Sequence, residues 1–511
     1  MQLLDLITIF IFALGIVIMG LSFSGKGRNM KSFFAAGGAV PWAMSGLSLF
    51  MGFFSAGTFV VWGSIAYSLG WIAISIQWTM AIAGFVVGFF IAPRWHKTSA
   101  LTVAEYITRR LGVNTQKTYT YLFLFISLFT TGSFLYPVAK IVEVSTGMPL
   151  DLCILLLGGF CIVYVAAGGL WAVVSTDVLQ FIILTAAVLI VVPLSFGRVG
   201  GVVNFIESIP ATYFNLVNGE YTIGFIIAFG VYNAIFLGGN WAYVQRYASV
   251  NSQSSARKVG FLFGGLYVVS AVLWMLPPMI YRIVNPSLST IDAEGAYLMM
   301  CKEVLPAGLL GLMLSGMVFA TASSLNATLN ISSGVVTNDI FKRLFPQSSD
   351  KTLMRVARIS TIIFGLLAII VALLIPLMGG IVNVVISVAA LTGVPLYLPI
   401  IWTLFSKRQT EYSVITTTLV SLGANAFFKF ITPLWGFGFN RAEEMIVGVA
   451  FPVFCLIAFE LYYKLNHKIS HRYVEYQEWE KENNCIKETE RKEDKVMTEA
   501  DNKSVSYTHL R

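Results

Sequence analysis

The sequence predicts an all-α polytopic membrane protein, and two observations support this prediction. Of the 511 residues, 57% are hydrophobic and only 12% are charged, and the mean hydropathy is +0.76. A soluble globular chain carries roughly twice that fraction of charge. Apolar runs of about 20 residues, the length that a helix needs to cross the hydrocarbon core, recur along almost the whole chain.

The apolar runs predict about 13 transmembrane helices in a domain that covers residues 1–463. The first run lacks a basic leader and a small-residue cleavage signature, so we interpret it as a retained span. Residues 464–511 are rich in both charge signs, which predicts a cytoplasmic, partly disordered tail. The expected spans are 3–22, 42–69, 73–93, 119–143, 151–167, 173–196, 222–245, 259–281, 304–338, 359–377, 381–404, 411–428 and 444–463.

The distribution of basic residues predicts the orientation. The net charge is +8, which by itself is also compatible with nucleic-acid binding. However, the loops on one side of the predicted bundle carry most of the lysines and arginines, as the positive-inside rule requires of cytoplasmic loops. We therefore expect the N-terminus outside, the C-terminus inside and no nucleic-acid partner. The few basic residues on the outer side are Arg198, Arg282, Lys302, Lys429 and Arg441.

The residues that most often carry catalysis or bind transition metals are scarce. The four histidines, at 96, 467, 471 and 509, all lie outside the middle of a predicted span. The five cysteines are scattered without a C-x-x-C pair, so neither a disulfide framework nor a zinc site is indicated. We therefore expect no enzyme and no organic cofactor.

Two predicted spans are interrupted at corresponding places. Span 42–69 holds a cluster of glycine, serine and alanine at 52–57, and span 222–245 holds Gly238, Gly239 and Asn240. Glycine weakens a helix by about 1 kcal/mol relative to alanine. An opened backbone is tolerated in the bilayer where it lines a cavity, and its free carbonyls suit a cation. The alternative is that these small residues only allow close helix packing.

The spacing of the two interruptions predicts an inverted repeat. The first opens one set of five spans and the second opens the next set. Because five is odd, the second set must cross the membrane upside down, which is typical of secondary transporters.

Span 304–338 carries an unusual polar stretch, "TASSLNATLNISS", from Thr321 to Ser333. On a helix, Ser323, Ser324 and Thr328 share one face at i, i+3 and i+4 spacing. Adjacent hydroxyls with a nearby carbonyl form a neutral cluster of hard oxygen donors, which suits Na⁺. The alternative is that these hydroxyls bond their own helix or join neighbouring helices, worth only about 0.6 kcal/mol each.

Three motifs resemble the sodium/solute symporter family, whose members move sugars, proline, sialic acid, pantothenate or monocarboxylates. They are "AAGGLWAVVSTDVLQ" at 166–180, "ASSLNATLNISSGVVTNDIF" at 322–341 and "NWAYVQRY" at 240–247. The resemblance covers about 1–463 in order and length. It implies the five-plus-five inverted-repeat (LeuT-like) transporter fold.

The resemblance also implies a sodium site between the second and ninth spans. Its ligands would be the carbonyls of Met51, Phe54 and Ala320 and the hydroxyls of Ser323 and Ser324. This agrees with the interruption and the serine pair that the residues themselves single out.

Asp177 is an acid inside a predicted span, and such residues are by default functional candidates. In some relatives the equivalent acid helps to form a second sodium site with serines one turn along the ninth span. Those positions are Asn326 and Ala327 here, and alanine supplies no side-chain oxygen. We keep Asp177 and Asn326 as candidates for a second ion or for gating, and we expect one Na⁺ per solute. The alternative is that Asp177 only pairs locally.

The solute site is expected beside the sodium site, between the two interruptions. In sugar-carrying relatives an asparagine at the position of Asn240 touches the solute and a tyrosine at that of Tyr243 closes over it. A sugar-contacting glutamine is replaced by Thr58, which shortens the polar reach. Trp62 and Tyr67 are further candidates, although aromatic residues in membrane helices often serve as packing or interface anchors.

The predicted function is sodium-coupled import of a small organic solute by alternating access in the plasma membrane, or in the inner membrane of a Gram-negative bacterium. The partners are the solute, a sodium ion and the lipid bilayer, and Na⁺ is the coupling ion. Two alternatives stay open: a proton-coupled carrier of the same fold that uses Asp177, and a transporter-like solute sensor.

Overall fold

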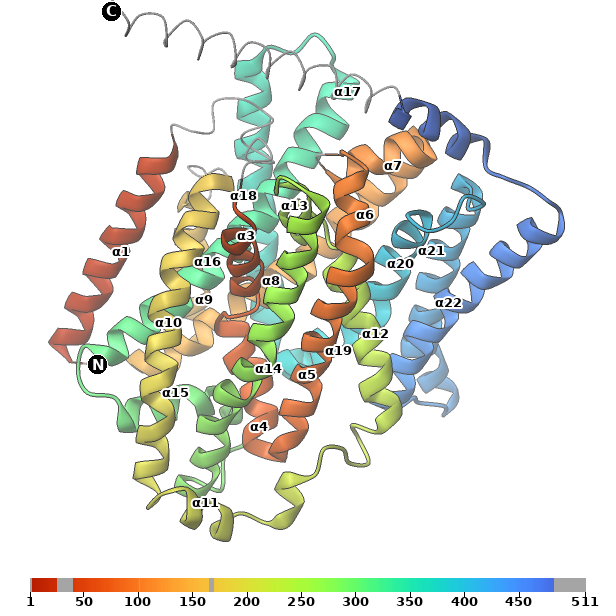
Figure 1. The fold of residues 1–511 in the computed structure, drawn as a ribbon. Helices are drawn as coiled ribbons and strands as arrows, with labels where there is room; N and C mark the ends of the chain where they lie inside the picture. The colour runs from red at the N-terminus through yellow and green to blue at the C-terminus, as the bar shows by residue number, and fades with distance from the viewer. Residues whose placement is uncertain (1, 25–39, 101, 165–169, 482–511) are drawn as a thin grey trace, which may run out of the picture.

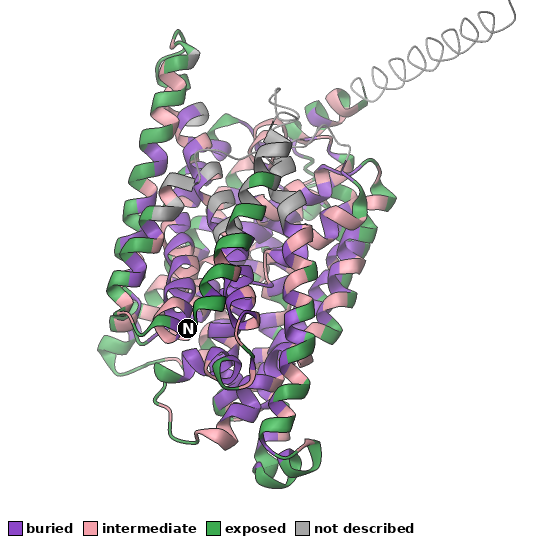
Figure 2. Ribbon diagram, turned by 90° about the vertical axis from the view of Figure 1, so that its left-hand side faces the viewer, coloured by how far each residue is buried: buried purple, intermediate pink, exposed green. Residues whose placement is uncertain are grey.

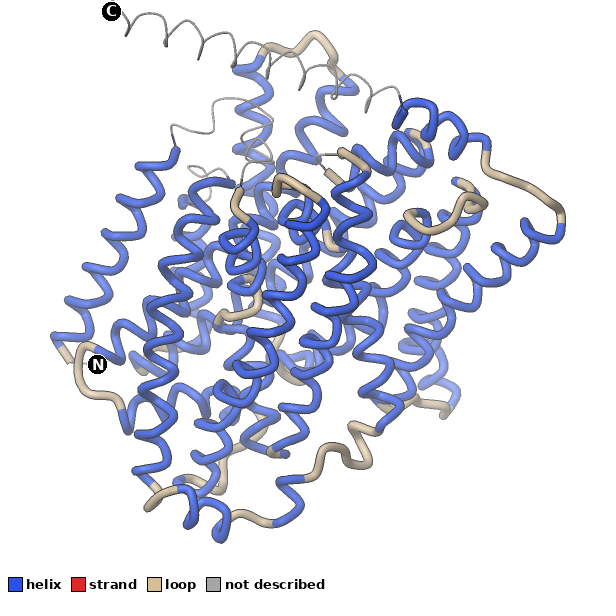
Figure 3. Tube along the Cα trace, in the orientation of Figure 1, coloured by secondary structure: helices blue, strands red, loops and turns tan. Residues whose placement is uncertain are grey.

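The computed structural model describes residues 2–24, 40–100, 102–164 and 170–481, and all the regular elements in these ranges are helices (Figure 3). Within the described residues each predicted span falls on a helix or on a run of helices, and the last three residues of span 151–167 lie outside them. In the first half these are α1 (Leu3–Ser24), α3 (Trp42–Met51), the π-helix η2 (Thr58–Trp62) with α4 (Gly63–Leu69), α5 (Trp71–Val86) with η3 (Val87–Ile91) and α6 (Ala92–Lys97), α8 (Val113–Thr146), α9 (Leu150–Tyr164) and α10 (Leu170–Arg198).

The second half repeats the pattern of long helices with one broken member. Its helices are α12 (Ile223–Gly239) with α13 (Trp241–Ala248), α14 (Gln253–Val284), α16 (Leu309–Val335) with η7 (Val336–Phe341), α18 (Asp350–Leu374), α19 (Ile381–Val388) with η9 (Ala389–Gly393) and α20 (Val394–Thr403), α21 (Glu411–Ala426) and α22 (Arg441–Leu465). Short helices connect them: α7 (Val103–Leu111), α11 (Val202–Ser208), η6 (Asp292–Gly295), α15 (Ala296–Val304) and α17 (Lys342–Leu344).

Several helices are long and apolar enough to cross a membrane unaided. In the described residues eight meet that test, and α12 with α13 forms a further span bent by 59°. The helices α3 and Thr58–Leu69 are shorter apolar pieces, separated by a non-helical stretch. The predicted interruptions of spans 42–69 and 222–245 are therefore confirmed as breaks in the helices.

The helices run roughly side by side, and two groups of them flank the breaks (Figure 1). On one side α3, α5, α12 and α14 pack together, and on the other α8, α9, α16 and α18 do so. The crossing of α5 with α14 depends on glycine. A Cβ on Gly260 would lie 2.5 Å from the Cα of Gly88, and one on Gly84 would lie 2.8 Å from the Cα of Gly264. Such small-residue pairs let helix backbones approach closely.

Burial follows the arrangement that a bilayer requires. The polar helix positions Thr321, Ser332 and Asp177 are nearly inaccessible, whereas Phe10, Phe125 and Phe454 are more than half exposed on outer helices. In Figure 2 buried residues fill the interior and exposed residues follow the outward faces. Large apolar side chains on an outer face are what lipid contact favours.

One end of the bundle gathers the short basic helices. The elements α6, α7, α13 and α17 all lie at the upper end in Figure 1, and each carries lysine or arginine in its last turn. After α22 the chain continues to helix 471–481, the dark-blue segment beside α7.

Candidate functional site

The first break follows α3, where the backbone leaves the helix between Gly52 and Ser55 before resuming as η2. Among the described residues, the carbonyls of Met51 and Phe54 accept no backbone hydrogen bond. The Thr58 hydroxyl donates to the carbonyl of Phe53, which fixes the end of the open stretch. Met51 and Phe54 are buried, at 1% and 2% exposure, and Met51 lines one of the cavities described below.

The first break is joined directly to α16. In a continuous helix the amide of Ala56 would donate to the carbonyl of Gly52. Here it donates instead to Oγ1 of Thr321, at 3.0 Å. Thr321 is fully buried and itself donates to the carbonyl of Met317. The opened backbone and the polar stretch predicted from the sequence therefore meet.

The polar face of α16 lies close to this junction. The Ser324 hydroxyl is 3.5 Å from the carbonyl of Ala320, a long contact, and the Thr328 hydroxyl donates to the carbonyl of Ser324 at 3.1 Å. Ser324 and Thr328 also line a cavity, described below. The backbone of Ser323 and Asn326 is helical, but their side chains lie outside the described part of the structure.

The second break, between α12 and α13, is stabilised by side chains. Asn240 caps α13, its Oδ1 accepting from the amide of Ala242 at 3.0 Å. That amide would otherwise pair with the carbonyl of Gly238, which now accepts from Nε1 of Trp95 at 2.7 Å. The carbonyl of Leu237, one residue earlier, accepts from the Tyr247 hydroxyl at 3.3 Å.

The glycines at the second break are required by close packing. A Cβ on Gly238 would lie 2.7 Å from Cδ1 of Ile91, and one on Gly239 would lie 2.7 Å from Cβ of Tyr397. Both distances are too short for a side chain. The pair of glycines thus brings α12 against α20 and against the end of η3.

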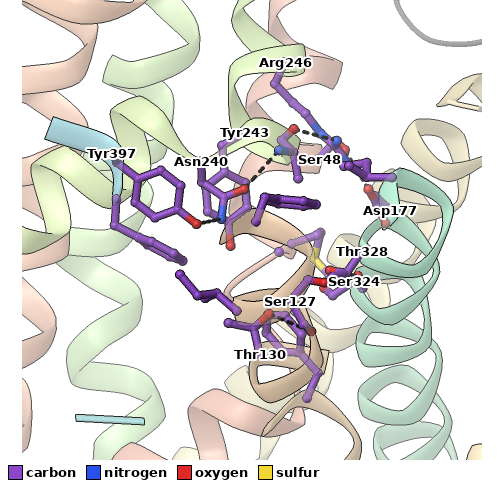
Figure 4. A pocket seen from close by; sticks show the side chains of 18 residues that line it. Ser48, Ser127, Thr130, Asp177, Asn240, Tyr243, Arg246, Ser324, Thr328 and Tyr397 are labelled. Carbon is purple, nitrogen blue, oxygen red and sulfur yellow. Dashed lines mark hydrogen bonds between the residues drawn. The ribbon is translucent and has the colours of Figure 1, made fainter. Parts of the chain in front are cut away.

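Two cavities lie between the breaks, and Tyr243 lines both. The larger has a volume of about 170 Å³ and the smaller about 80 Å³. Tyr243 is held between rings, with its centroid 5.0 Å from that of Phe53 and 5.5 Å from that of Phe236. Asn240 lies on the wall of the smaller cavity, where its Nδ2 is 3.4 Å from the Tyr397 hydroxyl (Figure 4).

Asp177 lies at the same wall, next to the end of α3. The Ser48 hydroxyl donates to its Oδ2 at 2.6 Å, which joins α3 to α10. Arg246 lines this cavity from α13, and its Nη1 donates to the carbonyl of Ala242 at 3.0 Å. In Figure 4 the Asp177 and Arg246 side chains lie on the side of the cavity away from Thr130 and Ser127.

The larger cavity contains Thr58 and Trp62, as expected, and several residues that sequence reasoning missed. Tyr67 is not among the lining residues, and its hydroxyl donates to the carbonyl of Asn285 at 2.6 Å. Gln77 is the most informative addition: it is 3% exposed, and its Nε2 lacks a hydrogen-bond partner within the described structure. The other polar groups on the wall are Ser55, Thr130, Ser133, Tyr232, Asn233, Tyr267, Thr392 and Tyr397.

Comparisons with known proteins agree with this geometry. The family model described as "Sodium:solute symporter family" matches residues 33–420. A sodium/glucose cotransporter of Vibrio parahaemolyticus is 28% identical over 472 residues, which cover 84% of this chain and 86% of the relative. Sodium/glucose cotransporter 1 of Mus musculus is 25% identical, with 89% and 76% covered.

A solved structure of a Na⁺-coupled sialic acid symporter, in a substrate-bound outward-open state, superposes with a TM-score of 0.76. It is 21% identical and covers 90% of this chain and 98% of its own. This likeness confirms the predicted helical transporter fold. Because the family model spans more than half of the chain, the predicted resemblance is confirmed: this multi-pass membrane protein belongs to the sodium:solute symporter family and is a sodium-coupled transporter.

Proposed function

We propose that this protein imports a small, uncharged polar solute together with one Na⁺ by alternating access. The observation that carries the proposal is the hydrogen bond from the Ala56 amide to Thr321. It joins an opened backbone to a polar helix at the edge of two cavities. A cation bound at this junction would contact both α3 and α16, so its binding would depend on how these helices are placed.

The proposed sodium ligands are the carbonyls of Met51, Phe54 and Ala320 and the hydroxyls of Ser323 and Ser324. Two facts support this set. The carbonyls of Met51 and Phe54 accept no backbone hydrogen bond in the described residues. The long Ser324 contact of 3.5 Å leaves its hydroxyl oxygen weakly engaged.

A stoichiometry of one Na⁺ is supported by the surroundings of Asp177. Its carboxylate is already bonded by Ser48, at 2.6 Å, and Arg246 carries a positive charge nearby. A cation here would compete with that guanidinium. We propose that Asp177 holds α3 against α10 at the inner end of the site, and we keep Asn326 as the second candidate for a gating role.

The proposed solute class follows from the lack of charged side chains among the described residues that line the larger cavity. Among its described lining residues there is no aspartate, glutamate, lysine, arginine or histidine. Enclosing a charged solute here without a partner would cost several kcal/mol. Hydroxyls, carboxamides and aromatic faces suit a sugar or another polyol. Gln77, with its unpartnered Nε2, is available to donate to a solute oxygen, and Thr58 and Tyr243 line the same cavity. Asn240, on the wall of the adjoining smaller cavity, is the third proposed solute contact beside Thr58 and Tyr243.

We further propose about 13 crossings with the N-terminus outside and the C-terminus inside, in the plasma membrane, or in the inner membrane of a Gram-negative bacterium. The basic helices α6, α7, α13 and α17 lie at one end, which supports a cytoplasmic placement of that end. The domain would end near residue 463, with 464–511 as a cytoplasmic tail.

The driving force would suffice for nutrient uptake. A membrane potential of about 100 mV drives one charge inward with about 2.3 kcal/mol. A tenfold sodium gradient adds about 1.4 kcal/mol. Together they sustain accumulation of a few hundredfold, provided that each ligand binds one state better than the other.

The test is uptake into proteoliposomes that contain the purified protein, with and without an inward Na⁺ gradient. The solute panel holds labelled glucose, galactose, myo-inositol, sialic acid, proline and lactate. Ser323→Ala and Ser324→Ala are run beside Thr361→Ala, whose hydroxyl donates to the carbonyl of Ala357 within α18. We expect Na⁺-dependent uptake of a neutral polyol, lost in the serine variants and kept in the control.

Three other results would overturn parts of the proposal. Uptake of sialic acid, proline or lactate in preference to the polyols would contradict the neutral-solute assignment. Uptake that follows a pH gradient, ignores Na⁺ and is lost in Asp177→Asn would establish the proton-coupled carrier. Solute and Na⁺ binding without uptake would favour the sensor.

A further inference from the structure

A row of aromatic side chains connects the second break to the end of the bundle that holds the basic helices. The row begins at the carbonyl of Gly238, which loses its helical partner at the break and accepts from Trp95. The Trp95 ring lies edge-on to Tyr106 of α7, with centroids 5.1 Å apart. Tyr106 in turn lies edge-on to Tyr476 of helix 471–481, at 5.9 Å.

Each member of this row is buried. Trp95 is 1% exposed, Tyr106 2% and Tyr476 8%, although Tyr476 belongs to the charged tail. The Tyr106 hydroxyl is also 3.0 Å from Oγ1 of Thr403 on α20. Burial raises the pKa of Tyr106 to about 12, so it stays a neutral hydroxyl at physiological pH.

Helix 471–481 is held in place by four further contacts. Arg109 stacks on Trp479 at 3.9 Å, Arg110 lies 4.9 Å from the Tyr473 ring, and Lys97 pairs with Glu480 at 3.9 Å. The amide of Ser470 donates to the carbonyl of Lys407 at 3.2 Å. The Lys97 pair is exposed on the lysine side and contributes little, but the ring contacts are extensive.

We propose that Trp95 is a positioning residue for the broken helix α12–α13, and that helix 471–481 supports it through Tyr476 and Tyr106. Trp95 replaces the donor that the break removes, so it stabilises the bent backbone at Gly238. The tail helix closes the far side of the same aromatic row and restricts Trp95. The tail thereby acts on Asn240 and Tyr243, two and five residues beyond Gly238, without touching them.

The inference builds on the proposed function, but its first readout needs neither solute nor transport. Hydrogen exchange is measured by mass spectrometry on the full chain in nanodiscs, comparing peptides that cover 236–248 with those that cover 53–61. Trp95→Phe keeps a ring and removes the donor. We expect exchange in 236–248 to rise about three- to tenfold, as loss of one net hydrogen bond implies, with 53–61 unchanged.

Two pairs of variants test the tail. Tyr476→Ala removes the ring contact and should raise exchange in 236–248 by about twofold or more, whereas Tyr476→Phe keeps the ring and should match the parent. A chain that ends at residue 469 should behave like Tyr476→Ala, and one that ends at residue 481 should match the parent. Tyr476→Ala keeps the test valid should the shorter truncation fail to fold.

The outcomes separate the two parts of the proposal and the transport function. Unchanged exchange at 236–248 in Trp95→Phe overturns the positioning role. An effect of Trp95→Phe without any effect of Tyr476→Ala overturns the role of the tail. A uniform rise across all peptides would indicate a general stability effect and also overturns the proposal. Where uptake is measurable, the solute KM should rise in Trp95→Phe with little change in kcat, and normal uptake with an unchanged KM would overturn the proposed effect on Asn240 and Tyr243.

Discussion

The break between α12 and α13 is closed by its own surroundings, whereas the break after α3 is left open toward another helix. At the break between α12 and α13, the side chains of Trp95, Asn240 and Tyr247 each replace a lost helical hydrogen bond. After α3, the amide of Ala56 reaches across to Thr321, and the carbonyls of Met51 and Phe54 gain no backbone donor in the described residues. A closed break suits a rigid solute contact, and an open one suits a cation.

The largest difference between the two breaks is expected when one methyl group is added at each. Gly239→Ala would place a Cβ 2.7 Å from Cβ of Tyr397 and 2.9 Å from Cδ1 of Ile401. Overpacking of this kind costs about 1–3 kcal/mol. Gly57→Ala, after α3, meets only Oγ of Ser55 at 3.7 Å and has helical backbone angles, so it should be neutral or stabilising by up to about 1 kcal/mol.

Thermal unfolding of the two purified variants measures this difference. We expect a clear loss of Tm in Gly239→Ala and an unchanged or raised Tm in Gly57→Ala. Equal losses in the two variants would mean that the breaks are packed alike.

A second prediction concerns the bond that joins the open break to α16. Thr321→Val keeps the shape and removes the acceptor of the Ala56 amide, leaving a buried donor unpaired at a cost of about 1–3 kcal/mol. Because this bond holds the proposed sodium site together, the Na⁺-induced rise in Tm should shrink as well. Thr361→Val is the matched control, since the Thr361 hydroxyl donates to the carbonyl of Ala357 in its own helix, α18. If Na⁺ raised the Tm of Thr321→Val as much as that of the parent, the bond between Ala56 and Thr321 would not be needed for sodium binding.

The positions of the two breaks could be predicted from the sequence, but not the contrast between them. Grouped glycines marked both breaks, and the run of hydroxyls marked the face of α16 that meets the first one. These signals are local, because glycine in a span and polar groups in a span are both costly unless they have a use. Thr58, Asn240 and Tyr243, the expected solute contacts, line the cavities, and Asp177 lines the smaller one, a position that had not been expected.

The partners of these groups could not be predicted, because they come from distant segments. Trp95 lies 143 residues before Gly238, and Thr321 lies 265 residues after Ala56. Gln77 carried no signal in the sequence, since a single polar residue in a span is commonly satisfied by packing partners. Helix 471–481 was hidden by its high charge, which resembles a solvated tail until Tyr476 is seen to be buried.

A third prediction, with a smaller effect, tests the cap of the closed break. Asn240→Ala removes the acceptor for the amide of Ala242 and should cost about 1 kcal/mol of stability, whereas Asn240→Ser keeps a capping oxygen and should lose only part of that. If Asn240 also contacts the solute, both variants should raise the KM for uptake, because serine is too short to reach. A KM restored by serine would assign Asn240 to capping alone.

The smallest expected effect concerns the pH dependence of stability, which we assign to a buried carboxyl outside both breaks. Glu294, in η6, is 3% exposed, and burial raises the pKa of its carboxyl despite bonds from the Tyr136 hydroxyl at 2.8 Å and the Ile381 amide at 3.0 Å. The native state therefore binds more protons than the unfolded state above pH 4.5, and this group's contribution to stability falls as the pH rises through its native pKa. In Glu294→Gln that slope should vanish, so the Tm of the variant should gain on the parent as the pH is raised. Equal slopes in the two proteins would assign the pH dependence to a group other than Glu294.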